Sequence, residues 1–316
     1  MNFLANAGMK VYKPNERQYI ATIPAIKGVE IVFQRPVDIF RKVSDASVDL
    51  GITGYDVMRE YDDEGDDVIV IEQLGFGGCS LLVAVPDSWI DTSTITDLAD
   101  LSLDYKQRGK ELRIATKYRH LTRDWLFKNS ITHFSLVDAE GALEAAPRMG
   151  YADMIADISA TGTTLKENRL KTLEGGTILD SEACLIANKR NLLDHKTKLR
   201  LTKHILELLE AYQRSRTYVS LTANIKGSSP KAVGDKLIQH PLLSGLVGPT
   251  ISEIRAKTPT TDGWYAVTII IEKANLINAM EHLRAEGGTD ISIVQPSYIF
   301  AETSKLFEKL QEMLTA

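Results

Sequence analysis

The sequence predicts an α/β protein made of a two-lobed clamp and a small C-terminal ferredoxin-like module. Three observations support this fold class. Strand-like and helix-like segments alternate through the first two thirds of the chain, which is typical of a mostly parallel α/β sheet. Segments 74–79 and 180–187 are placed to carry the chain from one lobe to the other and back. After residue 216 the expected order becomes βαββαβ, the order of a ferredoxin-like module.

Length and composition are those of an ordinary globular protein of two or three domains. The chain has 316 residues, of which 44% are apolar and 25% charged. A net charge of -5 without a basic block argues against a nucleic-acid binder. Because the sequence has neither an apolar run long enough to span a bilayer nor a signal peptide, we expect a cytoplasmic protein with no membrane partner. We expect Cys79 and Cys184 to be reduced thiols packed as small apolar residues.

The first lobe should begin with the end of a short helix, because Gly8 is a stop signal. Pro36 opens the next helix, since proline is tolerated at a first helical position. An acidic run is expected to form a solvated loop. In chain order the expected elements are helix 1–9, strands 18–23 and 29–34, helix 36–44, strand 48–54, helix 55–61, loop 62–67 and strand 68–72.

The second lobe should repeat the alternation of strands and helices. The glycine-rich segment 74–79 lacks the spacing of a dinucleotide fingerprint and precedes a strand, so we interpret it as a crossover. The expected elements are strands 80–85 and 112–116, helix 121–129, strand 133–137, helix 141–149, strand 154–157, a turn at Gly175-Gly176 and strand 180–187.

The last part of the chain starts with an amphipathic helix, 197–214. The module that follows should contain strand 217–224, helix 230–238, strands 250–255 and 264–271, helix 274–286 and strand 291–294. We therefore assign residues 1–78 and 183–215 to lobe I, 79–182 to lobe II and 216–316 to the C-terminal module.

The segment 150–170 carries the most informative chemistry. Its apolar run is interrupted by Asp157 and leads into a loop of small hydroxylic residues around Gly162, after which Leu165 begins a helical pattern. Backbone N–H groups and hydroxyls of such a loop can cradle a phosphate. Asp157 could then accept hydrogen bonds from ribose hydroxyls. The alternative is that a threonine of the loop only caps a helix.

Asp157-Ile-Ser-Ala-Thr-Gly-Thr-Thr-Leu165 resembles the 5-phosphoribosyl 1-diphosphate loop of the ATP phosphoribosyltransferase family, which begins histidine biosynthesis. Other segments resemble the same family in the same order: 33–39, 49–56, 74–79, 113–116, 141–147, 180–186, 248–252 and the pair Gly287-Gly288. The C-terminal module is similar to the histidine-binding regulatory domain of the long-form enzymes.

The resemblance implies a periplasmic-binding-protein-like catalytic clamp that transfers phosphoribosyl to N1 of ATP, releases diphosphate and is inhibited by L-histidine. No covalent nucleophile is required, and Mg²⁺ would be held mainly by substrate oxygens. The family forms oligomers, so a homo-oligomer between dimer and hexamer is implied. The implied ligands of 5-phosphoribosyl 1-diphosphate are Glu144, Asp157, Ser159, Ala160, Thr161, Gly162, Thr163 and Thr164.

For ATP, the resemblance indicates Arg35, Asp56, Lys117 and Tyr118; the case is weaker for Lys117, and for Arg119 beside it, because the family varies at these positions. For the effector histidine, it indicates Asn224, Thr250, Thr289 and Asp290. Each set has a simpler explanation. Glu144 and Asp56 could be first-turn acids favoured by a helix dipole, Arg35 an ordinary exposed arginine, and the effector residues strand ends and turns.

The sequence departs from the family at its start. The family opens with a strand and a Lys-Gly-Arg turn, and this sequence begins after both. We therefore expect either that the sequence starts at an internal methionine or that it is a short variant with impaired activity. Two other functions stay open: a solute-binding protein, which shares the clamp architecture, and a regulatory paralogue that binds histidine without turnover.

Overall fold

A computed structural model describes residues 1–15, 17–62, 67–139, 141–257 and 262–315. The chain divides into two compact units: one comprises Met1–Ile31 and Arg200–Lys309, and the other comprises Val32–Leu199 and Leu310–Ala316. In the described part of the chain, no helix has the length and apolar character needed to cross a membrane.

Lobe I is built on a three-stranded sheet of order β3-β10-β4, in which both pairings are antiparallel. Phe40 and Val43 of one helix and Val57 and Met58 of another pack with Ile186 of β10 in its core. The predicted helices 36–44 and 55–61 are confirmed, and the predicted acidic loop lies largely outside the described residues. The elements are α2 (Pro36–Ser44), β3 (Leu50–Gly54), α3 (Tyr55–Tyr61), β4 (Asp67–Ile71) and β10 (Ala183–Asn188).

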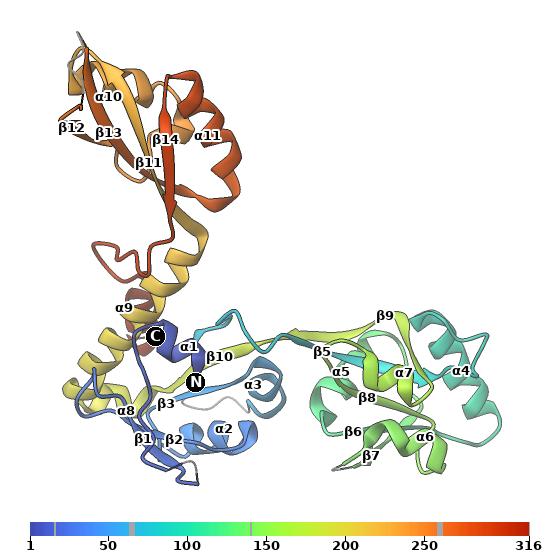
Figure 1. The fold of residues 1–316 in the computed structure, drawn as a ribbon. Coiled ribbons are helices and arrows are strands. Elements are labelled where there is room, and N and C mark those ends of the chain that lie inside the picture. Colours follow the sequence, from blue (N-terminus) through green and yellow to red (C-terminus); the bar gives the residue numbers. More distant parts are fainter. Residues whose placement is uncertain (16, 63–66, 140, 258–261, 316) are drawn as a thin grey trace. The chain divides into compact units, whose positions relative to one another are not determined.

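Lobe II is a three-layer α/β/α structure around a five-stranded sheet of order β7-β6-β8-β5-β9 (Figure 1). Its elements are β5 (Cys79–Pro86), α4 (Ile95–Gln107), β6 (Leu112–Thr116), α5 (Arg119–Lys128), β7 (Phe134–Asp138), η1 (Leu143–Ala145), α6 (Ala146–Met149), β8 (Met154–Ser159), α7 (Thr163–Glu167) and β9 (Leu170–Ser181).

Alternating side chains of the lobe II strands separate two cores. Ile114 of β6 packs with Leu98 of α4 and Leu126 of α5 on one face of the sheet. On the other face, Ala115 belongs to a cluster with η1, α6 and α7, in which Leu165 anchors α7. This alternation follows from the two-residue period of a strand.

Three expectations for the clamp were wrong. Its sheets are mixed, because β5 runs antiparallel to both β8 and β9, while β6 is parallel to β7 and β8. The turn predicted at Gly175-Gly176 is absent from β9, which continues through both glycines while its register against β5 shifts. Helix 141–149 is a 3₁₀ turn followed by the four-residue α6, and α4 was not predicted.

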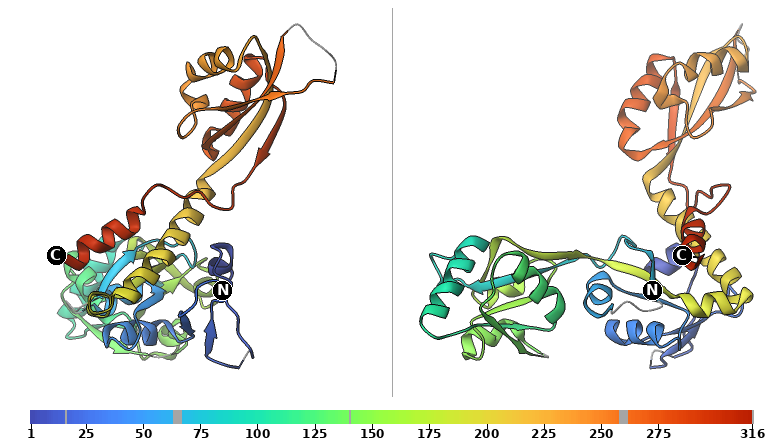
Figure 2. Two further views of the ribbon diagram at one scale, coloured as in Figure 1. Left: turned by 90° about the vertical axis from the view of Figure 1, so that its left-hand side faces the viewer. Right: turned by 180° about the vertical axis from the view of Figure 1, so that it is seen from behind.

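The C-terminal module confirms the predicted ferredoxin-like topology. Its strands form an antiparallel sheet of order β12-β13-β11-β14, and α10 and α11 pack on one face of it, as Figure 2 shows. Its elements are β11 (Tyr218–Gly227), α10 (Pro230–Ile238), η2 (Pro241–Leu243), β12 (Thr250–Ile254), β13 (Gly263–Glu272), η3 (Lys273–Asn275), α11 (Leu276–Ala285) and β14 (Thr289–Val294).

In sequence, the remaining elements belong to the start of the chain, to the segment 189–217 and to the end of the chain. They are α1 (Asn2–Asn6), β1 (Ile20–Thr22), β2 (Glu30–Val32), α8 (Lys189–Asp194), α9 (Lys196–Thr217) and α12 (Lys305–Thr315). Strands β1 and β2 pair as a two-stranded sheet, and α9 is the predicted amphipathic helix, a few residues longer than expected. Helix α12 was not predicted.

Candidate functional site

The predicted substrate residues of lobe II gather at one edge of its sheet. Strands β6, β7 and β8 are parallel, so their carboxyl ends meet at the same edge. Lys117 and Tyr118 follow β6, Glu144 lies in η1 after β7, and Ser159 ends β8, with residues 160–164 directly after it. In α/β sheets this edge is where ligands usually bind.

The loop after β8 has the backbone shape that a phosphate cradle needs. Gly162 adopts a φ of +71°, and a side-chain carbon at this position would have open space around it. Ser159 Oγ accepts a hydrogen bond from Gly162 N at 3.0 Å, and the hydroxyls of Thr161 and Thr163 lie 2.9 Å apart. Because α7 has only five residues, its dipole adds little, so N–H groups and hydroxyls would have to supply most of the contacts to an anion bound here.

Asp157 precedes the loop in β8, in an environment that favours its protonated form. Burial raises the pKa of its carboxyl, and the hydrogen bond from Ile158 N at 2.8 Å and the charge of Lys117 oppose this effect. Glu144 raises the same pKa further. Asp157, Glu144 and Lys117 are therefore close enough to interact electrostatically, which joins the ends of all three parallel strands in one site.

Asp56 and Tyr118, which the sequence assigned to ATP, bind each other. Tyr118 Oη donates to Asp56 Oδ2 at 2.6 Å, and only 5% of Asp56 is exposed. Burial and this carboxylate raise the pKa of the Tyr118 hydroxyl. The other oxygen, Asp56 Oδ1, accepts from Ser181 Oγ at 2.6 Å.

Two polar residues of this region were missed at the sequence level, Glu60 and Ser181. Glu60 is 4% exposed and accepts hydrogen bonds from the backbone N–H groups of His120 and Leu121 at 2.9 and 3.0 Å. Glu60 lies one helical turn after Asp56, a spacing that puts both carboxylates on one face of α3 and that could have drawn attention to it.

The two arginines considered for ATP phosphates have different surroundings. Arg35 is exposed at the N-cap of α2, and the structure gives its guanidinium no partner among the described residues. Arg119 Nη1 forms an ion pair with Asp138 Oδ1 at 2.6 Å. Arg119 would therefore have to leave Asp138 before it could use this nitrogen to bind a phosphate.

The predicted effector residues fall into two groups in the C-terminal sheet. Asn224 is paired with Thr289 across β11 and β14, and its Nδ2 lies 3.4 Å from Asp290 Oδ2. Thr250 lies in β12, at the other edge of the sheet from β14. It is paired with Thr268 of β13, which in turn is paired with Thr222, two positions before Asn224. The structure brings three of the four residues together and leaves Thr250 apart.

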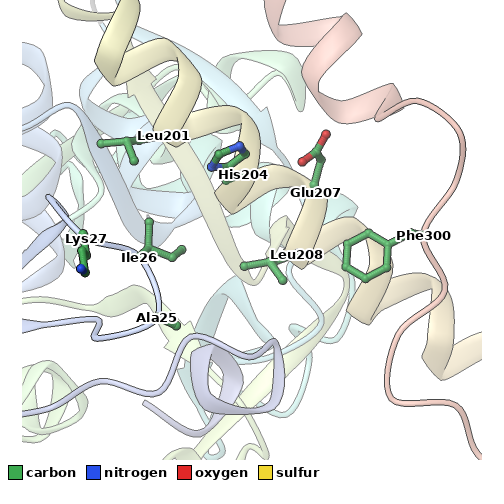
Figure 3. A pocket seen from close by; sticks show the side chains of 8 residues that line it. All are labelled: Ala25, Ile26, Lys27, Leu201, His204, Glu207, Leu208 and Phe300. Atoms are coloured by element: carbon green, nitrogen blue, oxygen red, sulfur yellow. The ribbon is translucent and has the colours of Figure 1, made fainter.

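A separate pocket of about 380 Å³ lies in the unit that contains Arg200–Lys309 (Figure 3). Leu201, His204 and Glu207 of α9 face Ile26 and Lys27 across it, and Phe300 closes one end. None of the predicted substrate or effector residues lines this pocket. Among the described residues, no group of three His, Cys, Asp or Glu side chains could hold a metal ion.

Comparisons with known proteins agree along the whole chain. Residues 35–211 match the sequence model described as HisG, ATP phosphoribosyltransferase, and residues 215–295 match the HisG C-terminal domain. The chain is 38% identical to chloroplastic ATP phosphoribosyltransferase 2 of Arabidopsis thaliana, over 98% of this chain and 76% of the relative. It is 32% identical to ATP phosphoribosyltransferase of Bradyrhizobium sp. (strain ORS 278), over 99% of this chain and 93% of the relative.

A solved structure supports the fold. The ATP phosphoribosyl transferase (HisG:HisZ) complex from Thermotoga maritima superposes with a TM-score of 0.50 at 21% identity, covering 66% of this chain and 92% of the other.

Proposed function

Because the chain belongs to the ATP phosphoribosyltransferase family, we propose that the carboxyl edge of the lobe II sheet binds its two substrates. The protein is a pentosyltransferase that transfers the phosphoribosyl group of 5-phosphoribosyl 1-diphosphate to N1 of ATP. A bond forms between adenine N1 and C1 of the ribose, and the bond from C1 to diphosphate breaks. The products are 1-(5-phosphoribosyl)-ATP and diphosphate, in the first step of L-histidine biosynthesis.

The reaction requires positioning and electrostatic stabilisation more than acid or base catalysis. Positive charge develops on the ribose while negative charge grows on diphosphate. The site must hold two polyanions with adenine N1 in line with the breaking bond. In this chain the loop 159–164, which we assign to the phosphate, closely follows Asp157 of β8, which we assign to the ribose hydroxyls.

The loop 159–164 is the observation that carries this proposal. Its glycine at positive φ, its hydroxyls and its N–H groups suit the 5-phosphate, and we assign to it Ser159, Ala160, Thr161, Gly162, Thr163 and Thr164. Asp157, just before the loop, accepts hydrogen bonds from the ribose hydroxyls. Glu144 faces the same ribose, which its electrostatic effect on Asp157 supports.

We place ATP beside Lys117, whose positive charge lies close enough to Asp157 to lower the pKa of that carboxyl. Arg35 is the second candidate for a nucleotide phosphate, since it is exposed and has no partner in the described structure. Asp56 and Tyr118 lie on the ATP side of the site. Because their polar atoms bind each other, they would act by fixing the backbone turn at Lys117 and Tyr118.

The chemistry of the donors fits a magnesium ion bound with the substrates. Mg²⁺ prefers oxygen ligands and often binds through substrate phosphates with only one or two carboxylates. Asp157 and Glu144 are such carboxylates, and the described residues lack a larger cluster. When bound, the ion would neutralise charge on the leaving diphosphate.

For regulation we propose that the C-terminal module binds L-histidine as an inhibitor, using Asn224, Thr250, Thr289 and Asp290. The match to the HisG C-terminal domain and the proximity of Asn224, Thr289 and Asp290 support this. We further propose a homo-oligomer, from dimer to hexamer, in which residues 1–78 and 183–215, 79–182, and 216–316 act as lobe I, lobe II and the regulatory domain.

We also propose a cytoplasmic location. Both cysteines are free thiols in the structure, as is usual in a reducing compartment. Burial raises the pKa of Cys79 and, to about 12, that of Cys184, so neither is a reactive thiolate at neutral pH.

The proposal is tested by following phosphoribosyl-ATP formation through its ultraviolet absorbance, with ATP, 5-phosphoribosyl 1-diphosphate and Mg²⁺. The assay is run on this chain and on one extended upstream in frame. Activity in both proteins confirms the reaction without an upstream segment. Activity in the extended protein alone confirms the reaction and assigns a role to that segment. If both bind histidine and neither turns over, the regulatory paralogue is the correct function.

A further inference from the structure

Helix α3 of lobe I presents two buried carboxylates on one face, Asp56 and Glu60. They are four positions apart in the sequence and are 5% and 4% exposed. A buried carboxylate is costly unless its oxygens accept hydrogen bonds. All four of these oxygens accept hydrogen bonds from groups of lobe II, which are Tyr118 Oη, Ser181 Oγ and the backbone N–H groups of His120 and Leu121.

Asp56 joins three segments. Its Oδ2 accepts from Tyr118 Oη at 2.6 Å, just before α5 of lobe II. Its Oδ1 accepts from Ser181 Oγ at 2.6 Å, and the same Oγ accepts from Asp56 N at 2.9 Å. Ser181 ends β9 and pairs with Cys79, the first residue of β5, so it sits where both connections between the lobes pass.

Glu60 takes the place of a helix cap. Tyr118, the N-cap residue of α5, makes no side-chain capping bond, so the first N–H groups of α5 need another acceptor. Glu60 supplies it from the other lobe, through one oxygen to His120 N and the other to Leu121 N. A carboxylate at this end also interacts favourably with the helix dipole.

We propose that Asp56 and Glu60 form a link between the lobes that positions the Lys117–Tyr118 turn for the ATP side of the transfer. This rests on the proposed function and deepens it. Asp56 and Glu60 act as positioning residues, because their oxygens are occupied by protein groups. The phosphate cradle should be independent of this link, since the core beneath it is built from the other face of the lobe II sheet.

Glu60→Gln tests the link, because it keeps the shape and one acceptor but removes the charge and the two-oxygen cap. We expect the KM for ATP to rise about tenfold. The Kd for 5-phosphoribosyl 1-diphosphate should change much less than the KM for ATP, because the hydrogen bonds of Ser159, Thr161 and Gly162 lie within the loop and Lys117 acts on Asp157 only through its charge. Backbone amide exchange should become faster in the peptide that contains His120 and Leu121.

Tyr118→Phe is the second variant, since it keeps the ring and removes only the hydroxyl bound to Asp56. It should raise the KM for ATP in the same way. In the double variant the KM for ATP should rise by less than the product of the two single increases, because both substitutions release the same turn at Lys117 and Tyr118.

Asp97→Asn is the matched control. Asp97 caps α4 inside lobe II by accepting from Ser93 N and Thr94 N at 2.9 and 2.8 Å. Its substitution should lower Tm without a selective change in the KM for ATP.

The inference is overturned if Glu60→Gln and Tyr118→Phe change only Tm, as Asp97→Asn does, or weaken both substrates equally. Failure of the proposed function looks different, because wild-type protein would then neither bind 5-phosphoribosyl 1-diphosphate nor form product.

Discussion

Asp157 gives the proposed site its pH dependence. In the proposed site its ionised form would accept hydrogen bonds from ribose hydroxyls, and burial raises its pKa above the ordinary aspartate value. We expect kcat/KM for 5-phosphoribosyl 1-diphosphate to fall as the pH decreases through this raised pKa. Asp157→Asn should reduce kcat/KM about tenfold at neutral pH and abolish the acid limb of the profile.

Stability provides the control for Asp157→Asn. A carboxyl whose pKa is raised by folding stabilises the folded state at low pH, and this contribution is lost as the pH rises through the folded-state pKa. The asparagine variant, which has no buried charge, should therefore be at least as stable as wild type at neutral pH. A variant with unchanged pH–rate and KM values would remove Asp157 from the site.

Gly162 separates backbone shape from side-chain chemistry in the same loop. A residue with a side chain at a φ of +71° costs about 1–2 kcal/mol, although the added carbon would meet no atom within 4 Å. Gly162→Ala should thus raise the KM for 5-phosphoribosyl 1-diphosphate with little change in the KM for ATP. Gly141→Ala is the control, because Gly141 also has open space but a φ outside the left-handed region. Equal effects of both would count against a cradle at Gly162.

Single residues were predictable where the chemistry is local in sequence. The loop around Gly162, with its glycine at positive φ, could be predicted because its hydroxyls, glycine and acid lie within eight positions, while its binding of a phosphate stays a prediction. Glu60 and Ser181 could not be read in this way, because their partners lie 60 and 125 positions away along the chain. The same distance in sequence explains why the hydrogen bond between Asp56 and Tyr118 was not predicted.

At the level of elements, the errors have identifiable causes. Helix α4 carries a capping box of Thr94 and Asp97, a sequence signal that would have revealed its start. The Gly175-Gly176 pair has the composition of a turn, yet β9 is held on both sides of it by pairing with β5. Tertiary pairing overrides local glycine preference here.

The start of β6 should depend on Asp153 just before β8. Asp153 Oδ2 accepts from Arg113 N at 2.8 Å, and Oδ1 accepts from its guanidinium at 2.8 Å. Asp153→Ala leaves that N–H and guanidinium without these bonds, so we expect a loss of about 2 kcal/mol in the free energy of unfolding. Urea unfolding measures it.

Asp104→Ala is the control for Asp153→Ala. Its ion pair with Arg108 spans 3.8 Å between side chains that are 57% and 71% exposed. Such pairs contribute about 0–1 kcal/mol, so this variant should unfold close to wild type. Comparable losses in the two variants would show that the Asp153 bonds carry no special weight.

Over the whole molecule, the order of the elements predicted the architecture better than the bounds of single elements did. The two crossovers predicted a clamp and the βαββαβ order predicted the C-terminal module, and both are present. Strand direction was less accessible, because β5 and β9 take their orientation from the crossovers and not from local pattern. The proposed ATP site shares this difficulty, since its groups come from both lobes.

Histidine inhibition is the property that should involve the whole molecule. If histidine binds the C-terminal module, it can slow the clamp only through a different affinity for two states of the protein. Thr250 forms a cross-strand pair with Thr268, apart from Asn224 and Thr289. We expect Thr250→Ala and Asn224→Ala to raise the histidine concentration needed for half inhibition about tenfold, with turnover nearly unchanged.

Thr268→Ala is the control for the Thr250 side chain, because Thr268 also bonds Thr222 within the sheet, with hydroxyls 2.9 Å apart. Its loss should lower stability without a selective effect on inhibition. If Asn224→Ala relieves inhibition and Thr250→Ala does not, the pocket is confined to the β11–β14 edge where Asn224, Thr289 and Asp290 meet. If either variant lowers turnover by as large a factor as it raises the histidine concentration for half inhibition, histidine acts in the clamp itself and the module has another role.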